Sequence, residues 1–84
     1  MNRYLVLLLR KSQVDPAVVA AHRDFLAELH AQGRNEMHGP FGDGAGGAYL
    51  LRANDRDEAL AIVERDPAYR SGGWEITVHE WQAS

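Results

Sequence analysis

The sequence predicts an α+β domain in which two helices cover one face of a four-stranded antiparallel sheet. Three observations lead to this prediction: the order of the apolar patterns, the proline and glycine residues between them, and a length of 84 residues. A chain this short hides only roughly 60% of the surface that it exposes when unfolded. We therefore expect a single domain over residues 1–84 that gains buried surface by pairing with a second copy.

The chain begins with a predicted strand and a predicted helix. The run from Arg3 to Arg10 is apolar between charged ends, which is typical of a central strand covered on both faces. Asp15 and Pro16 favour a helix start, because aspartate caps helices and proline fits the first helical position. An apolar stripe continues for about four turns until Gly33 favours the helix end. The stripe consists of Val18, Val19, His22, Phe25, Leu26 and Leu29.

A glycine-rich turn separates two strands in the middle of the chain. Residues 35–40 are mostly polar and end at Gly39 and Pro40, where a backbone donor is lost, so we expect an edge strand. Residues 42–47 are typical of a flexible turn. Residues 48–53 are then expected to form the second strand of a hairpin.

The second helix is expected to begin at Asn54 or Asp55. If Asp55 is the cap, Glu58 completes a start that resembles a capping box. Pro67 disfavours the helical conformation at Asp66, so we expect the helix to end there or one residue earlier.

The final strand is expected at residues 74–81, after the glycine pair at 72–73. Two faces alternate along it, one with Trp74, Ile76 and Val78 and the other with Thr77, His79 and Trp81. The order of elements is β-α-β-β-α-β, which is the ferredoxin-like layout. We expect the second face to lie on the side of the sheet that has no helix, where an interface with another copy would cover it.

This layout brings two ionisable residues to the same end of the domain. Right-handed crossovers make the helices antiparallel, so the first helix starts where the second one finishes. His22 lies on the apolar stripe about 9 Å beyond Pro16 along the helix axis, and Asp66 follows the second apolar pattern. The turn at residues 42–47 falls at this end as well. If His22 and Asp66 meet, they form an imidazole oriented by a carboxylate.

Composition and charge exclude several classes of protein. With no cysteine, neither a disulfide framework nor a thiolate metal site is available, which favours a cytoplasmic location. A net charge of −3 without a basic cluster argues against nucleic-acid binding. The apolar run at residues 4–9 is too short to span a membrane. A small molecule and a second copy of the chain remain as the expected partners.

The four histidines do not form a recognisable metal motif. His22 and His30 lie eight positions apart without a His-x-x-x-His pair, and His38 and His79 fall in different elements. We expect no metal and no cofactor. His30 and His38 are expected to be solvated surface groups.

The motifs that carry a family resemblance extend over nearly the whole chain. They are Arg3-Tyr-Leu-Val-Leu-Leu, His22-x-x-Phe-Leu-x-x-Leu29, Gly33, Gly39-Pro40, Ala48-Tyr-Leu-Leu51, Asp66-Pro67 and Val78-x-x-Trp81. This ordered set resembles the YciI-like (YCII-related) family of small bacterial proteins. The resemblance implies a dimeric α/β barrel that pairs through its sheets, with a His and Asp active site at His22 and Asp66. Most members have no assigned reaction. One branch dechlorinates a hydroxyquinol, but nothing in this sequence points specifically to that chlorinated substrate.

Four further residues are candidates for substrate binding. Arg70 and Ser71 follow Asp66 closely, so they either hold an anionic substrate or act as ordinary turn residues. Gly39 and Pro40, at the end of the expected edge strand, are the other two candidates.

The leading hypothesis is a homodimeric enzyme in which His22 acts as a general base or acid and Asp66 fixes its tautomer. An imidazole with an ordinary pKa of ~6.5 transfers protons near neutral pH. Because no serine or cysteine nucleophile is set beside the base, proton abstraction, isomerisation or elimination on a small organic molecule fits better than hydrolysis.

Alternatives of other classes stay open. The domain could be a non-catalytic module that binds a small ligand or mediates dimerisation. His22 could be a satisfied core histidine and Asp66 the cap of a short turn. An RNA-binding domain has the same element order, but residues 45–52 lack its aromatic and basic pattern.

Overall fold

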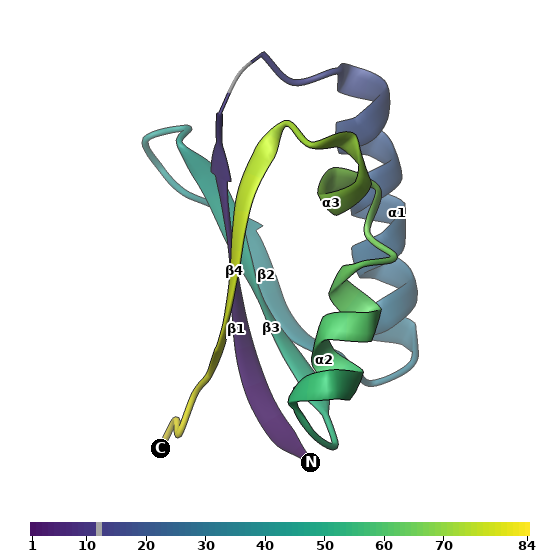
Figure 1. Ribbon diagram of the computed structural model, residues 1–84, viewed down its shortest axis with the longest axis vertical. Coiled ribbons are helices and arrows are strands. Elements are labelled where there is room, and N and C mark those ends of the chain that lie inside the picture. The colour runs from purple at the N-terminus through teal and green to yellow at the C-terminus, as the bar shows by residue number, and fades with distance from the viewer. Residues whose placement is uncertain (12) are drawn as a thin grey trace.

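Four strands form one antiparallel sheet, and the helices lie against one of its faces (Figure 1). The computed structural model describes residues 1–11 and 13–84. Its elements are β1 (Asn2–Arg10), α1 (Pro16–Ala31), β2 (Asn35–Pro40), β3 (Gly46–Ala53), α2 (Arg56–Val63), α3 (Pro67–Ser71) and β4 (Trp74–Glu80). The strand order is β2-β3-β1-β4, and each neighbouring pair is antiparallel. The predicted ferredoxin-like fold class is confirmed, with β2 at an edge.

Aspartate side chains begin both long helices. The carboxylate of Asp15 accepts a hydrogen bond from the backbone N–H of Ala17 at 2.9 Å, and that of Asp55 accepts from Glu58 N–H at 2.8 Å. The Glu58 carboxylate in turn accepts from the backbone N–H of Asn54 at 3.0 Å. Asp55 is therefore the cap of α2, and the reciprocal bond of the capping box reaches one residue further upstream than the motif requires.

The structure contains a third helix, the short α3, in addition to the two that the sequence predicts. α2 ends at Val63, earlier than expected, and a turn then leads to Asp66, whose N–H donates to Val63 O at 3.0 Å. The backbone of Asp66 is extended (φ −66°, ψ 127°), as a residue before proline prefers, so Asp66 starts α3 instead of ending α2. Of the helices that the structure describes, none is long and apolar enough to span a membrane.

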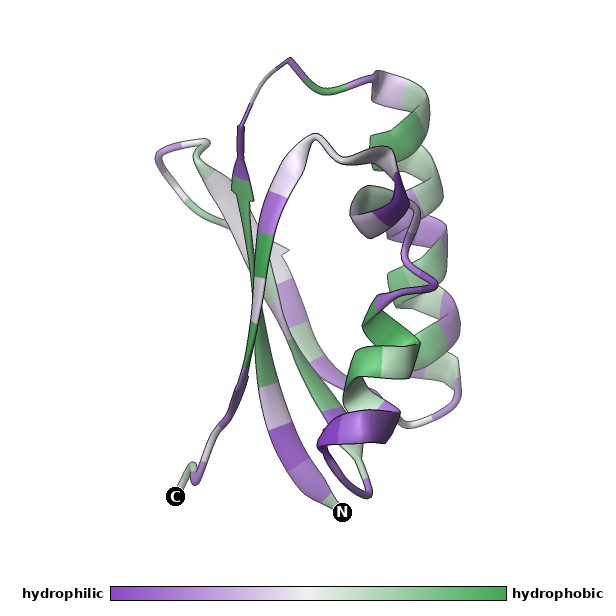
Figure 2. Cartoon of the chain, in the orientation of Figure 1, coloured by the Kyte–Doolittle hydropathy of each residue, from purple (hydrophilic) through white to green (hydrophobic). Residues whose placement is uncertain are grey.

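β1 has one face covered by the helices and one face open. The covered face carries Tyr4, Val6 and Leu8, each at most 3% exposed. On the other face Leu9 is 42% exposed, and Leu5 and Leu7 are half-buried. Figure 2 shows the hydrophobic positions along β1 and along the helices that cover it. The expectation that this strand is covered on both faces is therefore wrong for a single chain, because all the helices lie on one side.

β3 begins at Gly46, two residues before the expected start at Ala48. Gly46 and Gly47 pair with Leu9 and Leu8 of β1, so part of the predicted turn belongs to the sheet. A Cβ at Gly46 would overlap the backbone oxygen of Leu8. Glycine therefore allows the two strands to approach closely at this position.

Candidate active site

His22 of α1 and Asp66 at the start of α3 are in direct contact. The Nδ1 atom of His22 lies 2.9 Å from Oδ1 and 2.8 Å from Oδ2 of Asp66. The Asp66 side chain is fully buried, and that of His22 is 18% exposed. An ionised carboxylate only accepts hydrogen bonds, so Nδ1–H donates and the lone pair of the neutral ring is on Nε2. The contact therefore sets the tautomer that a general base needs.

Asp66 makes a second hydrogen bond that holds it in place. Its Oδ1 accepts from the backbone N–H of Ala68 at 2.9 Å, which caps α3. The capping and orienting contacts considered for this aspartate are thus made by the same carboxylate. Because α3 packs on α1, the cap fixes the carboxylate beside His22.

Tyr49 lies beneath this pair on the covered face of β3. Its ring centroid is 6.3 Å from that of His22, and the side chain is 1% exposed. Burial first, and then the charge of Asp66, raise the pKa of the Tyr49 hydroxyl. The hydroxyl therefore stays protonated and adds no negative charge to the site.

Sequence reasoning did not include Tyr49 in the site. The signal was the alternation of residues 48–53, which places Tyr49 on the same face as the core positions of β1. It was missed because a tyrosine at a core position is ordinarily a packing residue.

A cavity of about 140 Å³ lies beside His22, between α1, the β2–β3 hairpin and the ends of β1 and β4. Charged and aromatic side chains meet apolar ones in its lining, which includes Arg10, His22, Arg23, His38, Trp74 and Leu26. The Arg10 guanidinium lies over the Trp74 ring, 5.5 Å from its centroid. The start of α1, the helix α3 and the hairpin turn gather toward one end of the molecule (Figure 1), the arrangement that the topology argument predicts.

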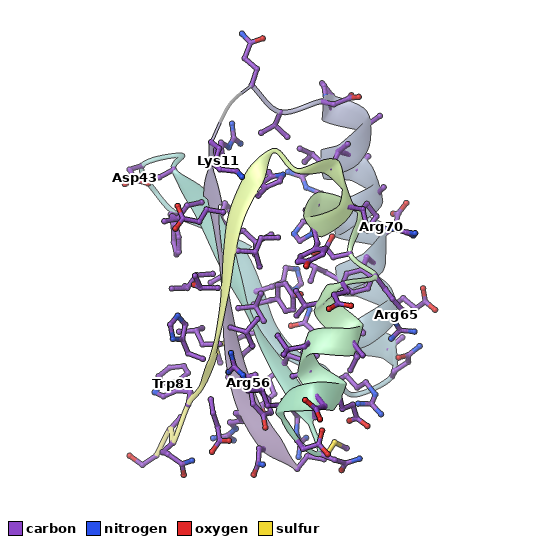
Figure 3. All side chains as sticks on the ribbon, viewed as in Figure 1. Lys11, Asp43, Arg56, Arg65, Arg70 and Trp81 are labelled. Atoms are coloured by element: carbon purple, nitrogen blue, oxygen red, sulfur yellow. The ribbon has the colours of Figure 1, made fainter. Side chains whose placement is uncertain are left out.

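The other predicted binding residues divide into two pairs. Gly39 and Pro40 line the cavity beside His22, whereas Arg70 and Ser71 do not. Arg70 lies on the helix side of the molecule (Figure 3). The Ser71 hydroxyl donates to the backbone oxygen of Ala68 at 2.8 Å, as a turn residue does. A substrate role for each of the four stays a prediction.

No group of three or more His, Cys, Asp or Glu side chains is arranged to hold a metal ion in residues 1–11 and 13–84. His30 and His38 are exposed, as expected. His38 nevertheless lines the cavity, which the sequence did not predict.

Residues 3–82 match the model of the YCII-related domain. The chain belongs to this family. It is 42% identical over 82 residues to the uncharacterized protein YjpA of Bacillus subtilis (strain 168), covering 98% of this chain and 96% of that protein. The resemblance to the YciI-like family is therefore confirmed.

Two solved structures share the fold. The first is 5-chloro-2-hydroxyhydroquinone dehydrochlorinase (TftG) from Burkholderia phenoliruptrix AC1100 in complex with 2,5-dihydroxybenzoquinone. It has a TM-score of 0.75 and 19% identity, covering 98% of this chain and 95% of that one. The second is muconolactone isomerase, with a TM-score of 0.78 and 14% identity over 98% of this chain and 90% of that one. The fold of this chain is therefore that of the dimeric α/β-barrel proteins.

Proposed function

We propose that the protein is a small homodimeric enzyme that uses the His22 and Asp66 pair for acid–base chemistry on a small organic molecule. The observation that carries this proposal is the 2.8 Å contact between His22 Nδ1 and a fully buried carboxylate. It leaves Nε2 as the basic atom of a ring that lines a cavity. The cavity volume of about 140 Å³ suits a small ligand.

The reaction class that fits best is proton abstraction followed by isomerisation or elimination. His22 Nε2 removes a proton from carbon, and the Asp66 carboxylate stabilises the positive ring that forms. The same nitrogen then returns the proton to another carbon, or the C–H electron pair forms a C=C bond while a leaving group departs with the pair of its own bond to carbon. Among residues 1–11 and 13–84, those that line the cavity include no serine or cysteine and so offer no hydroxyl or thiol nucleophile for hydrolysis. The names of the two structural neighbours, a dehydrochlorinase and an isomerase, support the same class.

The open face of the sheet supports the homodimer. Large apolar side chains remain exposed there, with Leu9 at 42%, Met37 at 63% and Trp81 at 47%. Figure 3 shows Trp81 on the side of the sheet away from the helices. Pairing two such faces buries these side chains and gives β1 its second cover. The fold similarity to dimeric α/β-barrel proteins supports the same arrangement.

The test follows proton exchange from D₂O into muconolactone, whose lactone carbonyl makes neighbouring C–H bonds acidic. We expect the wild-type protein to incorporate deuterium, as measured by proton NMR, and His22→Gln to incorporate none beyond the uncatalysed rate. His30→Gln is the matched control, because His30 is an exposed histidine of the same helix outside the cavity lining. Circular dichroism checks that all three proteins fold.

Two results would contradict the proposal. One is a wild-type protein that catalyses no exchange. The other is His22→Gln with wild-type exchange, which would leave a cavity that binds small molecules without the predicted base.

A further inference from the structure

A buried asparagine fixes the orientation of a second histidine in the cavity. Asn35 is 2% exposed, and its Nδ2 donates to the backbone oxygen of Leu26 at 3.3 Å. That oxygen can only accept, so this end of the amide is the nitrogen. The same Nδ2 lies 2.9 Å from Nδ1 of His38, where its second hydrogen is available to donate.

The hydrogen bond from Asn35 sets the tautomer of His38. Because Nδ1 accepts, the neutral ring carries its proton on Nε2. This is the opposite of His22, where Nδ1 donates to Asp66 and Nε2 is the free acceptor. Both rings line the same cavity. The cavity therefore holds two imidazoles with different roles: His22 can accept a proton, and His38 can donate a hydrogen bond.

The charged groups of the cavity favour an anion. Of the residues that the structure describes, its lining includes Arg10 and Arg23 and no aspartate or glutamate. An anionic ligand supplies the negative charge that pairs with these two guanidinium groups.

We propose that His38 is the hydrogen-bond donor of the site, and that the cavity takes a small organic anion in which a carbonyl oxygen faces His38 and an acidic C–H faces His22. The C–H part rests on the proposed function. His22 Nε2 takes the proton, the C–H electron pair forms a C=C bond as the C=O π pair moves onto oxygen, and His38 Nε2–H donates to the resulting enolate. In a ligand with a C=C bond beside the acidic carbon, return of the proton to the far carbon of that bond reforms the carbonyl and shifts the double bond, so the step needs no oxidant or reductant. Asn35 is a positioning residue that acts through His38.

The first test reads the tautomers without any ligand. Nitrogen-15 NMR of the neutral side chains at pH 8 is expected to show His38 protonated at Nε2 and His22 protonated at Nδ1. His30 is the internal reference, because its Nδ1 lies 3.1 Å from the backbone oxygen of Asn35 and must donate. A His38 ring protonated at Nδ1 would overturn the proposal.

The second test measures binding of 2,5-dihydroxybenzoquinone, a small acidic dicarbonyl compound, by its absorbance. His38→Ala is expected to weaken binding by at least about tenfold. His38→Gln, which places an amide N–H near the position of Nε2–H, is expected to restore part of the affinity. Glu28→Gln, at an exposed position of α1 outside the cavity lining, is expected to bind as the wild type does. Unchanged affinity in His38→Ala, or no binding to the wild-type protein, would overturn the proposal.

Proton exchange into muconolactone separates this proposal from the proposed function. Suppose that His22→Gln loses proton exchange, whereas His38→Ala exchanges protons and binds the quinone as the wild type does. This result would overturn the role of His38 and leave His22 as the base. Proton exchange that persists in His22→Gln would overturn the role of His22 as the base. Weaker quinone binding by His38→Ala would, in that case, still support His38 as the hydrogen-bond donor.

Discussion

At the scale of single residues, Asp66 combines two contacts in one buried carboxylate. It accepts from His22 and from the N–H of Ala68, so it holds α3 in place and orients the imidazole at once. A buried carboxylate is costly to desolvate, and these hydrogen bonds offset that cost. Substitution by asparagine can separate the two roles. Its amide oxygen can still accept from the N–H of Ala68, but the negative charge beside His22 is lost.

We predict that Asp66→Asn keeps the fold and loses most of the proton exchange. The amide oxygen can still cap α3, but the neutral side chain no longer stabilises a positive His22 ring, so exchange is expected to fall by roughly 10³-fold or more. Asp66→Ala also loses the cap of α3 and the charge-assisted hydrogen bond to His22, which lowers the free energy of unfolding by about 2–4 kcal/mol. Urea denaturation and deuterium incorporation measure the two effects. If Asp66→Asn and Asp66→Ala lowered the free energy of unfolding equally, the capping role and the catalytic role of Asp66 would not be separable in this way.

At the scale of elements, Glu58 links the start of α2 to residues outside the helix. Glu58 accepts from the backbone N–H of Asn54 at 3.0 Å and pairs with Arg34 at 2.9 Å. The hydrogen bond from Asn54, and then that from Arg34, lower the pKa of Glu58 below its ordinary value of 4.5. A carboxylate whose pKa is lowered by folding stabilises the folded state above the unfolded pKa.

The predicted consequence is a pH-dependent loss of stability in Glu58→Gln. Above pH 4.5 the substitution is expected to lower the urea midpoint, because only the ionised group makes these contacts in full. As the pH falls from 4.5 through the lower folded pKa, the difference from the wild type is expected to shrink. Glu28→Gln, an exposed glutamate of α1, is the control. A difference that stays constant or grows on acidification would contradict the assigned hydrogen bonds.

At the scale of the whole molecule, the helices cover only one side of the sheet. The open side carries an apolar row on β1 and β3, with the ion pairs of Arg3 and Arg52 to Glu36 at one end of it. In a small domain this apolar area is a large fraction of the surface that could be buried. Its most direct cover is the matching face of a second copy.

We therefore predict that Leu9→Lys weakens self-association and leaves the domain folded. Leu9 is 42% exposed, so the charge reaches water in a monomer but is buried when two open faces meet. Analytical ultracentrifugation measures the dissociation constant, which is expected to rise by at least about tenfold. Tyr69→Lys is the control, because Tyr69 is 47% exposed on α3 in the helix layer. Dissociation by Tyr69→Lys and not by Leu9→Lys would place the interface on the helix side.

Local patterns in the sequence determined the order of elements and most of their ends. Asp15 caps α1, Asp55 caps α2 and β2 lies at an edge, because caps, prolines and alternation act within a few residues. Handedness then placed the start of α1 and the end of the α2 region together. The same local rules missed the separate helix α3, since they did not distinguish whether Asp66 ends one helix or starts another.

Only the tertiary structure decided how the side chains meet. The distance between His22 and Asp66 depends on how α1 and α3 pack, and the position of Tyr49 and His38 depends on the register of the hairpin. The tautomer of His22 depends on Asp66, 44 positions away in the sequence, and that of His38 depends on Asn35 of the same strand, beyond the irregular register between Asn35 and Met37. The sequence by itself determined an ionisable pair at one end of a ferredoxin-like fold. Packing decided that the pair touches and that a second histidine shares its cavity, because those contacts join elements that the local patterns describe only separately.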